Sequence, residues 1–253
     1  MKYCILASGS KGNSTYIETK YARILVDAGL SAKKIADRLK SIDVDPESID
    51  SIVLTHSHND HVRGIGQFAF KYNVPIYAHP ETLDEITRKL KQGQKITPWQ
   101  GAFYIKDALF TPFDLSHDCY PTFGYLIRES MRTLAICTDL GVATPRVKEH
   151  LRKANLLILE SNHDPIMLMN GAYPWHLKER IASRVGHLSN VEAGELIHDI
   201  FHSGLEKIVL AHLSEDNNTS QIARDTVLEI AGNQIESHVE VIEQRRMSAI
   251  FQD

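Results

Sequence analysis

Several short apolar segments of the chain each end at a polar residue of a kind that binds metal ions. The segments are rich in β-branched and aliphatic residues, which predicts buried β-strands. They cover residues 21–26, 50–54, 108–115, 133–137, 155–159 and 207–210. The residues just beyond their ends include Asp27, His56, His117, Asp139, Glu160 and His212. Because strand ends gather at one edge of a sheet, we expect these side chains to lie close together.

Helical patterns lie between the predicted strands. Apolar positions recur at helical spacing over residues 32–42, 65–72, 81–90, 145–153, 174–185, 190–203 and 220–232. Ser189 and Asn190, followed by Glu192, give one of these helices a capped start. Strands mixed with helices predict a layered α/β or α+β fold. No repeat or linker divides the sequence, so a single domain over residues 1–253 is expected.

Composition and charge narrow the class of protein. Apolar residues make up 43% of the 253 residues and charged residues 24%, as in soluble globular proteins. The formal net charge of −4 excludes a wholly basic nucleic-acid wrapper but not a local basic patch. No segment approaches the roughly 20 apolar residues of a membrane span, so no membrane contact is expected. Residues 239–253 alternate between apolar and polar, which is compatible with an added edge strand.

Cysteine usage indicates a reducing compartment. The three cysteines, Cys4, Cys119 and Cys137, form no CxxC pair, which argues against a disulfide framework. The opening residues, MKYCILASGSKGNS, are too polar for a secretory signal, and their apolar stretch is too short. A cytoplasmic location is therefore expected.

The densest chemical signal is the segment THSHNDH at residues 55–61. His56 and His58 are two positions apart, so they point the same way on an extended chain but not on a helix. Asp60 and His61 follow where the chain is predicted to turn into the next helix. These four ligands exceed the three that a catalytic zinc usually receives from the protein. They favour two metal ions about 3.5–4 Å apart.

Other strand ends supply the remaining ligands. His117, Asp139 and His212 are weak signals singly, since a lone histidine at a strand end is usually structural. Together with the segment at residues 55–61 they complete two sites. Imidazole and carboxylate ligands suit Zn²⁺, Mn²⁺ or Fe, and the sequence does not choose among these metals.

The order of these residues resembles the signature motifs of the metallo-β-lactamase superfamily. The motifs run from Asp27 through HxHxDH at residues 56–61 to His212, and so cover most of the chain. Further segments resemble one branch, the YycJ/WalJ/VicX family of bacterial metallohydrolases, with PhnP-like phosphodiesterases as the nearest neighbours. These segments are SGSKGNST, VDAGLSAKKI, LTHSHNDHVRGI, TDLG, LESNHD, YPWHLKERI, GHLSN and LAHLSEDNN.

The resemblance implies a four-layer αββα sandwich of the α+β class that holds two divalent metal ions. The first metal would be bound by His56, His58 and His117. The second would be bound by Asp60, His61 and His212, with Asp139 bridging the two. Three residues are expected to support these ligands without binding metal: Asp27, Glu160 and His163.

The resemblance also implies hydrolysis by a hydroxide that bridges the two metals. Such a hydroxide would attack a phosphorus or carbonyl centre while the metals stabilise the developing charge. Asp60 and His187 are the expected catalytic residues. His187 lies just before a predicted helix start, where backbone N–H groups favour phosphate, and is expected to protonate the leaving group or contact the phosphate.

Local features favour a phosphodiester substrate. Lys178, Arg180 and Arg184 form a cationic strip on an acidic protein, and residues 8–15 form a Gly- and Ser-rich segment with N–H donors. The expected substrate contacts are Ser8, Lys11, Asn13, Lys178, Arg180 and Ser189. Tyr173 and Trp175 are weaker candidates for stacking on a base. The family resemblance implies 5′-to-3′ exonuclease activity on DNA.

Three alternatives stay open. A small cyclic phosphodiester, as in PhnP-like enzymes, or a thioester, as in glyoxalase-II-like enzymes, would suit the same ligands. A non-catalytic metal-binding regulator is disfavoured by the intact ligand set. A groove lined by Lys178, Arg180 and Lys33 or Lys34 would favour a polymer, and a closed pocket would favour a small ester. DNA is the first expected partner, and a homodimer is an open expectation.

Overall fold

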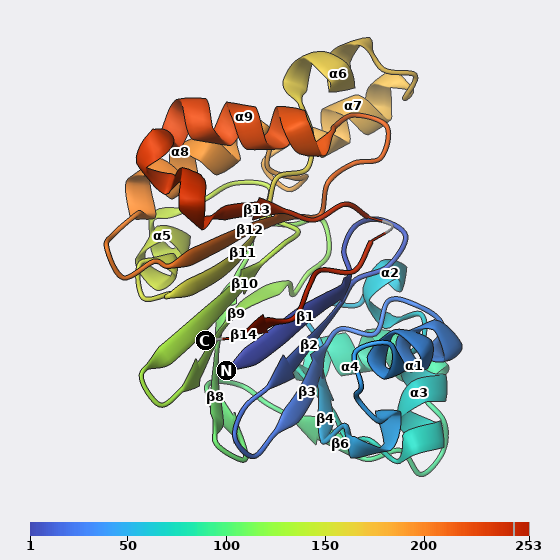
Figure 1. Ribbon diagram of the computed structural model, residues 1–253. Helices are drawn as coiled ribbons and strands as arrows, with labels where there is room; N and C mark the ends of the chain where they lie inside the picture. The colour runs from blue at the N-terminus through green and yellow to red at the C-terminus, as the bar shows by residue number, and fades with distance from the viewer. Residues whose placement is uncertain (245, 253) are drawn as a thin grey trace.

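The computed structural model describes residues 1–244 and 246–252, which form two seven-stranded sheets packed face to face (Figure 1). The first sheet has the order β14-β1-β2-β3-β4-β5-β6. From β14 to β3 the strands are antiparallel, and from β3 to β6 they are parallel. Their bounds are β1 Lys2–Ala7, β2 Ser14–Glu18, β3 Arg23–Val26, β4 Ser51–Val53, β5 Ile76–Ala78, β6 Ile96–Pro98 and β14 Phe251–Gln252.

The second sheet has the order β13-β12-β11-β10-β9-β8-β7. From β7 to β10 the strands are antiparallel, and from β10 to β13 they are parallel. Their bounds are β7 Phe103–Ile105, β8 Ala108–Asp114, β9 Phe123–Glu129, β10 Arg132–Cys137, β11 Leu156–Glu160, β12 Lys207–Ala211 and β13 Val239–Val241. Because β8 and β10 both pair antiparallel with β9, they run in the same direction, and their carboxyl ends reach the same edge.

Helices cover the outer face of each sheet (Figure 1). On the first sheet lie α1 (Ala32–Lys40), α2 (Asn59–Val62), α3 (Ile65–Tyr72) and α4 (Pro80–Ile86). On the second lie α5 (Pro145–Leu151), α8 (Asn190–Ile200) and α9 (Ser220–Ala231). The helices α6 (Pro165–Asn170) and α7 (Trp175–Ile181) project beside α9. Three short 3₁₀ helices are η1 Pro46–Ser48, η2 Thr87–Lys89 and η3 Asn233–His238.

Alternation along the strands explains the layers. On β1, Tyr3 and Ile5 belong to the apolar cluster between the two sheets, whereas Cys4 and Leu6 belong to the cluster under the helices. Successive side chains of a strand point to opposite faces, so a strand covered on both sides reads as a continuous apolar run. This double burial confirms the predicted four-layer αββα sandwich.

Several predicted elements end earlier than expected. The helix expected over residues 174–185 stops at Ile181, because the N–H of His187 bonds the Ile181 carbonyl and turns the chain back. The helix expected over 81–90 ends at Ile86 and continues only as the 3₁₀ turn η2. Among the described residues, no helix is both long and apolar enough to cross a membrane.

The C-terminal residues add an edge strand to each sheet rather than one strand to one sheet. β13 pairs with β12 in the second sheet, and β14 pairs with β1 in the first. The predicted edge strand over residues 239–253 is therefore split in two. Arg245 and Asp253, within that range, lie outside the described residues.

Candidate metal centre

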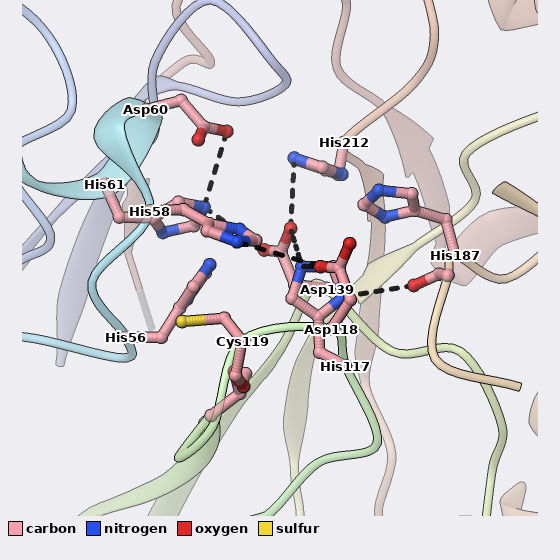
Figure 2. A network of polar contacts seen from close by, with 12 residues as sticks. His56, His58, Asp60, His61, His117, Asp118, Cys119, Asp139, His187 and His212 are labelled. Carbon is pink, nitrogen blue, oxygen red and sulfur yellow. Dashed lines mark hydrogen bonds and ion pairs between the residues drawn. The ribbon is translucent and has the colours of Figure 1, made fainter. Parts of the chain in front are cut away.

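The predicted ligands meet at one edge of the sandwich, as the strand-end pattern indicated (Figure 2). His56 and His58 lie on the extended segment after β4, and Asp60 and His61 lie on the one-turn helix α2. The second sheet contributes three residues beyond the ends of β8, β10 and β12, namely His117, Asp139 and His212. Both sheets therefore supply ligands to a single centre.

The ligand atoms fall into groups of the size that a metal ion needs. Those of His56, His58 and His117 lie within 4.8 Å of one another. A second group with the same spacing consists of Asp60, His61 and His212. These are the two sets that the family resemblance assigned to two metals.

Asp139 lies between the two groups. One carboxylate oxygen is 3.3 Å from Nε2 of His61. The other is 3.8 Å from Nε2 of His117 and 3.5 Å from Nε2 of His212. A carboxylate that faces both groups in this way fits the bridging position assigned to Asp139.

Asp27 and Thr55 set the orientation of two imidazoles. Asp27 Oδ2 lies 2.8 Å from Nδ1 of His61, and since a carboxylate only accepts, Nδ1 carries the proton. The Thr55 hydroxyl donates to the same oxygen at 2.9 Å and lies 2.9 Å from Nδ1 of His56. With its proton directed to Asp27, that hydroxyl accepts from His56. In the neutral form of each ring, Nε2 is therefore the unprotonated nitrogen.

Hydrogen bonds at Nδ1 also orient the imidazole rings of His117 and His212. Nδ1 of His117 donates to the carbonyl of Gly186 at 3.1 Å. Nδ1 of His212 lies 2.8 Å from Oε2 of Glu160, and its backbone N–H donates to the Ser8 hydroxyl at 2.8 Å. Four imidazoles therefore turn Nε2 toward the centre, which is the arrangement that metal ligation requires.

Glu160 accepts hydrogen bonds from several residues that the second sheet brings to the centre. Its Oε2 accepts from Nδ1 of His187 at 3.0 Å and from the backbone N–H of Asp139 at 2.9 Å. Its Oε1 accepts from the backbone N–H of Leu188 at 2.8 Å. A carboxylate filled by so many donors supports the ligands and is poorly placed to bind metal itself.

The charges of the cluster shift its pKa values strongly. Burial alone would lower the pKa of His61, but the carboxylates of Asp139 and Asp27 raise it well above its usual value. Burial likewise opposes the raised pKa of His212, which reaches about 9 beside Asp139 and Glu160. Burial would raise the pKa of Glu160, but His187 and His212 lower it to about 2. The centre thus gathers carboxylate charge that cations neutralise.

The donor set fits a pair of divalent cations. Among the described residues, Nε2 of His56, Oδ2 of Asp139 and Nε2 of His212 are buried without a hydrogen-bond partner. Buried polar atoms are normally paired, so such orphans at one point indicate a missing partner. Imidazole nitrogens and carboxylate oxygens in this number suit Zn²⁺, Mn²⁺ or Fe.

Three residues of the centre, one supporting residue and two candidate ligands, adopt strained backbone conformations. Asp27, Asp139 and His212 have φ angles of 64°, 60° and 56°, in the left-handed region that side chains other than glycine rarely adopt. Each lies just beyond the end of a strand that contributes to the centre. Such conformations persist where surrounding contacts enforce them, as at functional sites.

A cavity of about 260 Å³ opens over the metal ligands. Its floor includes His58, Asp60, His117, Asp139 and His212, and His187 stands at its side. The rest of its wall comprises Ser10, Asp118, Asn162, Tyr173, Leu177, Arg180, Ile181, Gly186, Ser214 and Gln244. The cavity is therefore polar at the metal end and partly apolar along α7.

Of the predicted substrate contacts, only Arg180 is a wall residue of this cavity. Lys178 is buried, and its ammonium group donates to the Met169 carbonyl at 2.7 Å, away from the centre. Ser189 caps α8, accepting from Glu192 N–H, while Glu192 accepts from the N–H and hydroxyl of Ser189. The substrate roles of both residues stay predictions.

The loop at residues 8–15 supports the metal ligands. The buried Asn13 donates its backbone N–H to the Asp60 carbonyl at 2.7 Å, and its Nδ2 lies 2.8 Å from Nε2 of His61. Lys11 is exposed and pairs with Glu215. Ser8 is buried against the His212 backbone. These contacts indicate a structural role, and substrate contact by Ser8, Lys11 and Asn13 stays a prediction.

Asp118 is a residue of the site that sequence reasoning did not select. Its carboxylate pairs with Arg180 and lies 3.3 Å from Nε2 of His117 and 3.7 Å from Nε2 of His58. Its position directly after His117 was the available signal. His163 was expected to support the ligands. It is buried near the start of α6, and its carbonyl accepts a hydrogen bond from the Asn190 N–H. Its supporting role stays a prediction.

Residues 22–213 match the family described as the Beta-lactamase superfamily domain. The chain therefore belongs to the β-lactamase superfamily, in agreement with its ligand motifs. It is 36% identical over 233 residues to the exodeoxyribonuclease WalJ of Streptococcus pneumoniae, covering 90% of this chain and 87% of WalJ. It is also 36% identical over 234 residues to the exodeoxyribonuclease YycJ of Bacillus anthracis, covering 91% and 89%. Within the superfamily, the chain is a member of the WalJ/YycJ family.

A solved structure shares the whole fold. The metallo-β-lactamase fold protein YhfI from Bacillus subtilis matches with a TM-score of 0.75 at 18% identity, covering 98% of each chain. At that identity the likeness concerns the fold alone, and it agrees with the sandwich described above.

Proposed function

We propose that the protein is a metal-dependent phosphodiesterase that acts as an exonuclease on DNA. The observation that carries this proposal is the convergence of two ligand groups on Asp139, with His187 beside them. The names of WalJ and YycJ, both exodeoxyribonucleases, support DNA as the substrate. The 5′-to-3′ direction comes from the family resemblance.

The chain's ligands would hold two divalent cations, Zn²⁺, Mn²⁺ or Fe. His56, His58 and His117 would hold one cation, and the other would be held by Asp60, His61 and His212, with Asp139 shared. Such cations lower the pKa of water and neutralise charge on a phosphate. Asp27, Thr55 and Glu160 keep the ring protons on Nδ1, so that Nε2 remains free to bind.

His187 is the residue we assign to the leaving group. Its Nδ1 donates to Glu160, and it lines the cavity beside the ligands. Burial would lower its pKa, but the Glu160 carboxylate outweighs burial and raises it above 6.5. A protonated imidazole at this position can deliver a proton to a departing alkoxide.

Arg180 is the residue we assign to substrate phosphate. It is a cationic member of the cavity wall, and Asp118 holds it near His58 and His117. The N-terminus of α8 is less suited to this role than the sequence indicated, because Ser189 and Glu192 already occupy its first donors. A guanidinium group binds phosphate oxygens in pairs, which favours Arg180 as the anchor.

A small phosphodiester is the second candidate substrate. The groove that would favour a polymer was expected to contain Lys178, Arg180 and Lys33 or Lys34, and of these residues only Arg180 lines the cavity. A volume of about 260 Å³ lies below the roughly 300–1,000 Å³ of typical ligand pockets. An exonuclease is compatible with that size, since only one end of a strand must enter.

The deciding experiment compares a small ester with DNA. Mn²⁺-loaded protein would be given bis(p-nitrophenyl) phosphate and, separately, end-labelled duplex DNA. We expect turnover of both, lost in Asp139→Ala and retained in Asp114→Ala, because Asp114 is exposed and pairs only weakly with Arg146 at 3.9 Å. Turnover of the ester alone would indicate that the substrate is a small phosphodiester and not DNA. No turnover of either would overturn the proposal and reopen the thioesterase and regulator alternatives.

Two expectations about the protein's surroundings remain predictions. One is a homodimer. The other is a cytoplasmic location, which was expected from the cysteine pattern, the polar opening residues and the lack of a long apolar segment.

A further inference from the structure

The cavity has an apolar wall that the reaction at the metal centre does not use. Tyr173, Leu177 and Ile181 all line the cavity. Leu177 and Ile181 are four positions apart on α7 and so share one face of that helix, and Tyr173 lies just before Pro174, the residue that caps its start. Apolar stripes of this kind usually pack into a core, yet this one borders a cavity with a polar floor.

Tyr173 is held in a fixed position within that wall. Its hydroxyl donates at 2.7 Å to Asp216, which lies in the loop that follows His212. Burial, together with that carboxylate, raises the pKa of Tyr173, so the phenol stays neutral. The ring is therefore fixed at two points: the backbone connects it to α7, and its hydroxyl hydrogen-bonds to the loop that contains Asp216.

The cavity lining also includes amide groups. Asn162 and Gln244 both line the cavity. Nε2 of Gln244 donates to the Leu213 carbonyl at 3.0 Å, while among the described residues its buried Oε1 has no hydrogen-bond partner. Amide side chains are suited to the edges of bases, and aromatic rings are suited to their faces.

We propose that this cavity is a subsite for a single unpaired terminal base, with the Tyr173 ring as its stacking platform. This inference rests on the proposed function, since it needs a phosphodiester at the metal centre. A nucleotide whose phosphate lies at Arg180 would carry its base along the wall formed by Tyr173, Leu177 and Ile181. The volume of about 260 Å³ is large enough for one base.

The consequence is a strand end that must leave the duplex stack before cleavage. Enzymes that act on a nucleotide inside a narrow pocket take it out of the stack. Stacking on an aromatic ring offsets part of the stacking energy that the base loses when it leaves the duplex, and any base can stack in this way. The cavity would therefore favour terminal over internal phosphodiesters without reading sequence.

The test compares two oligodeoxynucleotides that differ only in their terminal bases. One is an ordinary single strand, and the other carries abasic residues at both ends, so the direction of attack need not be known. The metal content per chain is measured for every variant as the control for the metal centre. The wild-type protein should cleave the ordinary strand with a kcat/KM about tenfold higher than that for the abasic strand. The difference should come from a lower KM for the ordinary strand.

Three variants separate stacking from other effects. Tyr173→Leu should abolish the discrimination between the two strands, by raising the KM for the ordinary strand, while keeping the wild-type metal content per chain. Tyr173→Phe, which keeps the ring but loses the Asp216 contact, should retain most of the discrimination. Trp175→Leu is the matched control, because Trp175 is an exposed aromatic residue two positions further along the chain that is not among the cavity-lining residues.

Each other outcome overturns the inference. Equal cleavage of both strands by the wild type, or retained discrimination in Tyr173→Leu, would exclude a stacking role. Loss of metal from Tyr173→Leu would show that the residue supports the metal centre instead. An equal effect of Trp175→Leu would assign the change to α7 as a whole. If the wild type hydrolyses no phosphodiester at all, the proposed function itself fails.

Discussion

The buried carboxylate of Glu160 accepts a hydrogen bond from Nδ1 of His187 at 3.0 Å, and this contact links the metal ligands to the proposed proton donor. The same oxygen lies 2.8 Å from Nδ1 of His212 and accepts the Asp139 backbone N–H. Glu160 therefore sets the orientation of one metal ligand, the backbone of another and the pKa of His187. A change at this one residue should affect both metal binding and protonation.

The first prediction concerns the pH dependence of turnover in Glu160→Gln. The carboxylate raises the pKa of His187 above 6.5, so the protonated acid is present below that raised pKa and lost as the pH rises through it. The amide removes the charge, so the alkaline limb of the kcat profile should move to lower pH. We would measure the profile with bis(p-nitrophenyl) phosphate at saturating metal.

The control for this prediction is His187→Gln. That variant should lower kcat by about 10²–10⁴-fold, the usual range for a general acid, and remove the alkaline limb while retaining both metals. Loss of a metal from His187→Gln would make His187 a ligand. An unmoved limb in Glu160→Gln would exclude His187 as the titrating group.

The second prediction concerns metal affinity in Asp27→Asn. Asp27 accepts from Nδ1 of His61 and from Thr55, so its loss frees two rings to rotate or change tautomer. Partners of this kind typically contribute 10–100-fold to metal affinity, and we expect that loss by competition with a chelator. Asp43→Asn is the matched control, because Asp43 also has a positive φ, 58°, but is exposed. Equal affinities in the two variants would contradict the role of Asp27.

The sequence predicted that the candidate ligands would lie close together, because they follow strand ends. Spacing alone showed that His56 and His58 share a direction on an extended chain, and the structure has them there. The positions of the other ligands relative to one another depend on which strands pair. That information came from the family resemblance and not from the residues.

The substrate side was less predictable because side-chain direction is a tertiary property. Lys178 belongs to a cationic run in the sequence, yet its ammonium group turns inward to the Met169 carbonyl. Asp118 looked like a neighbour of a ligand, and only the approach of α7 reveals its pairing with Arg180. Short strands such as β5 and β6 were also missed, since three residues give no periodicity and depend on their neighbours for pairing.

The third prediction concerns Arg180 and its partner Asp118. Arg180→Gln should raise the KM for DNA with little change in kcat and should weaken the salt dependence of KM, because one phosphate contact is lost. Asp118→Asn should act in the opposite direction on KM by releasing the guanidinium for phosphate. Steady-state kinetics between 50 and about 200 mM salt would test both effects. Arg184→Gln, outside the cavity, is the control, and an equal effect there would point to general surface charge.

The fourth prediction concerns Cys119, which lies beside His56 in Figure 2. Its Sγ is 3.2 Å from the Ser57 hydroxyl, and it belongs to none of the ligand groups among the described residues. Cys119→Ser should therefore leave two metals per chain, measured by elemental analysis after desalting. Loss of one metal would show that the thiolate is a ligand.

The last prediction concerns the fit between two loops at the metal centre. A Cβ on Gly29 would lie 1.5 Å from the carbonyl oxygen of Asp60, so any side chain there must displace the backbone that carries Asp60 and His61. Gly29→Ala should lose the second metal and nearly all phosphodiesterase activity while keeping the secondary structure seen by circular dichroism. Gly101→Ala is the matched control, since a Cβ there would meet nothing within 4 Å. Full metal content in Gly29→Ala would contradict the view that the ligand loop is held rigidly, because the loop would then have moved by more than an ångström and still bound its cation.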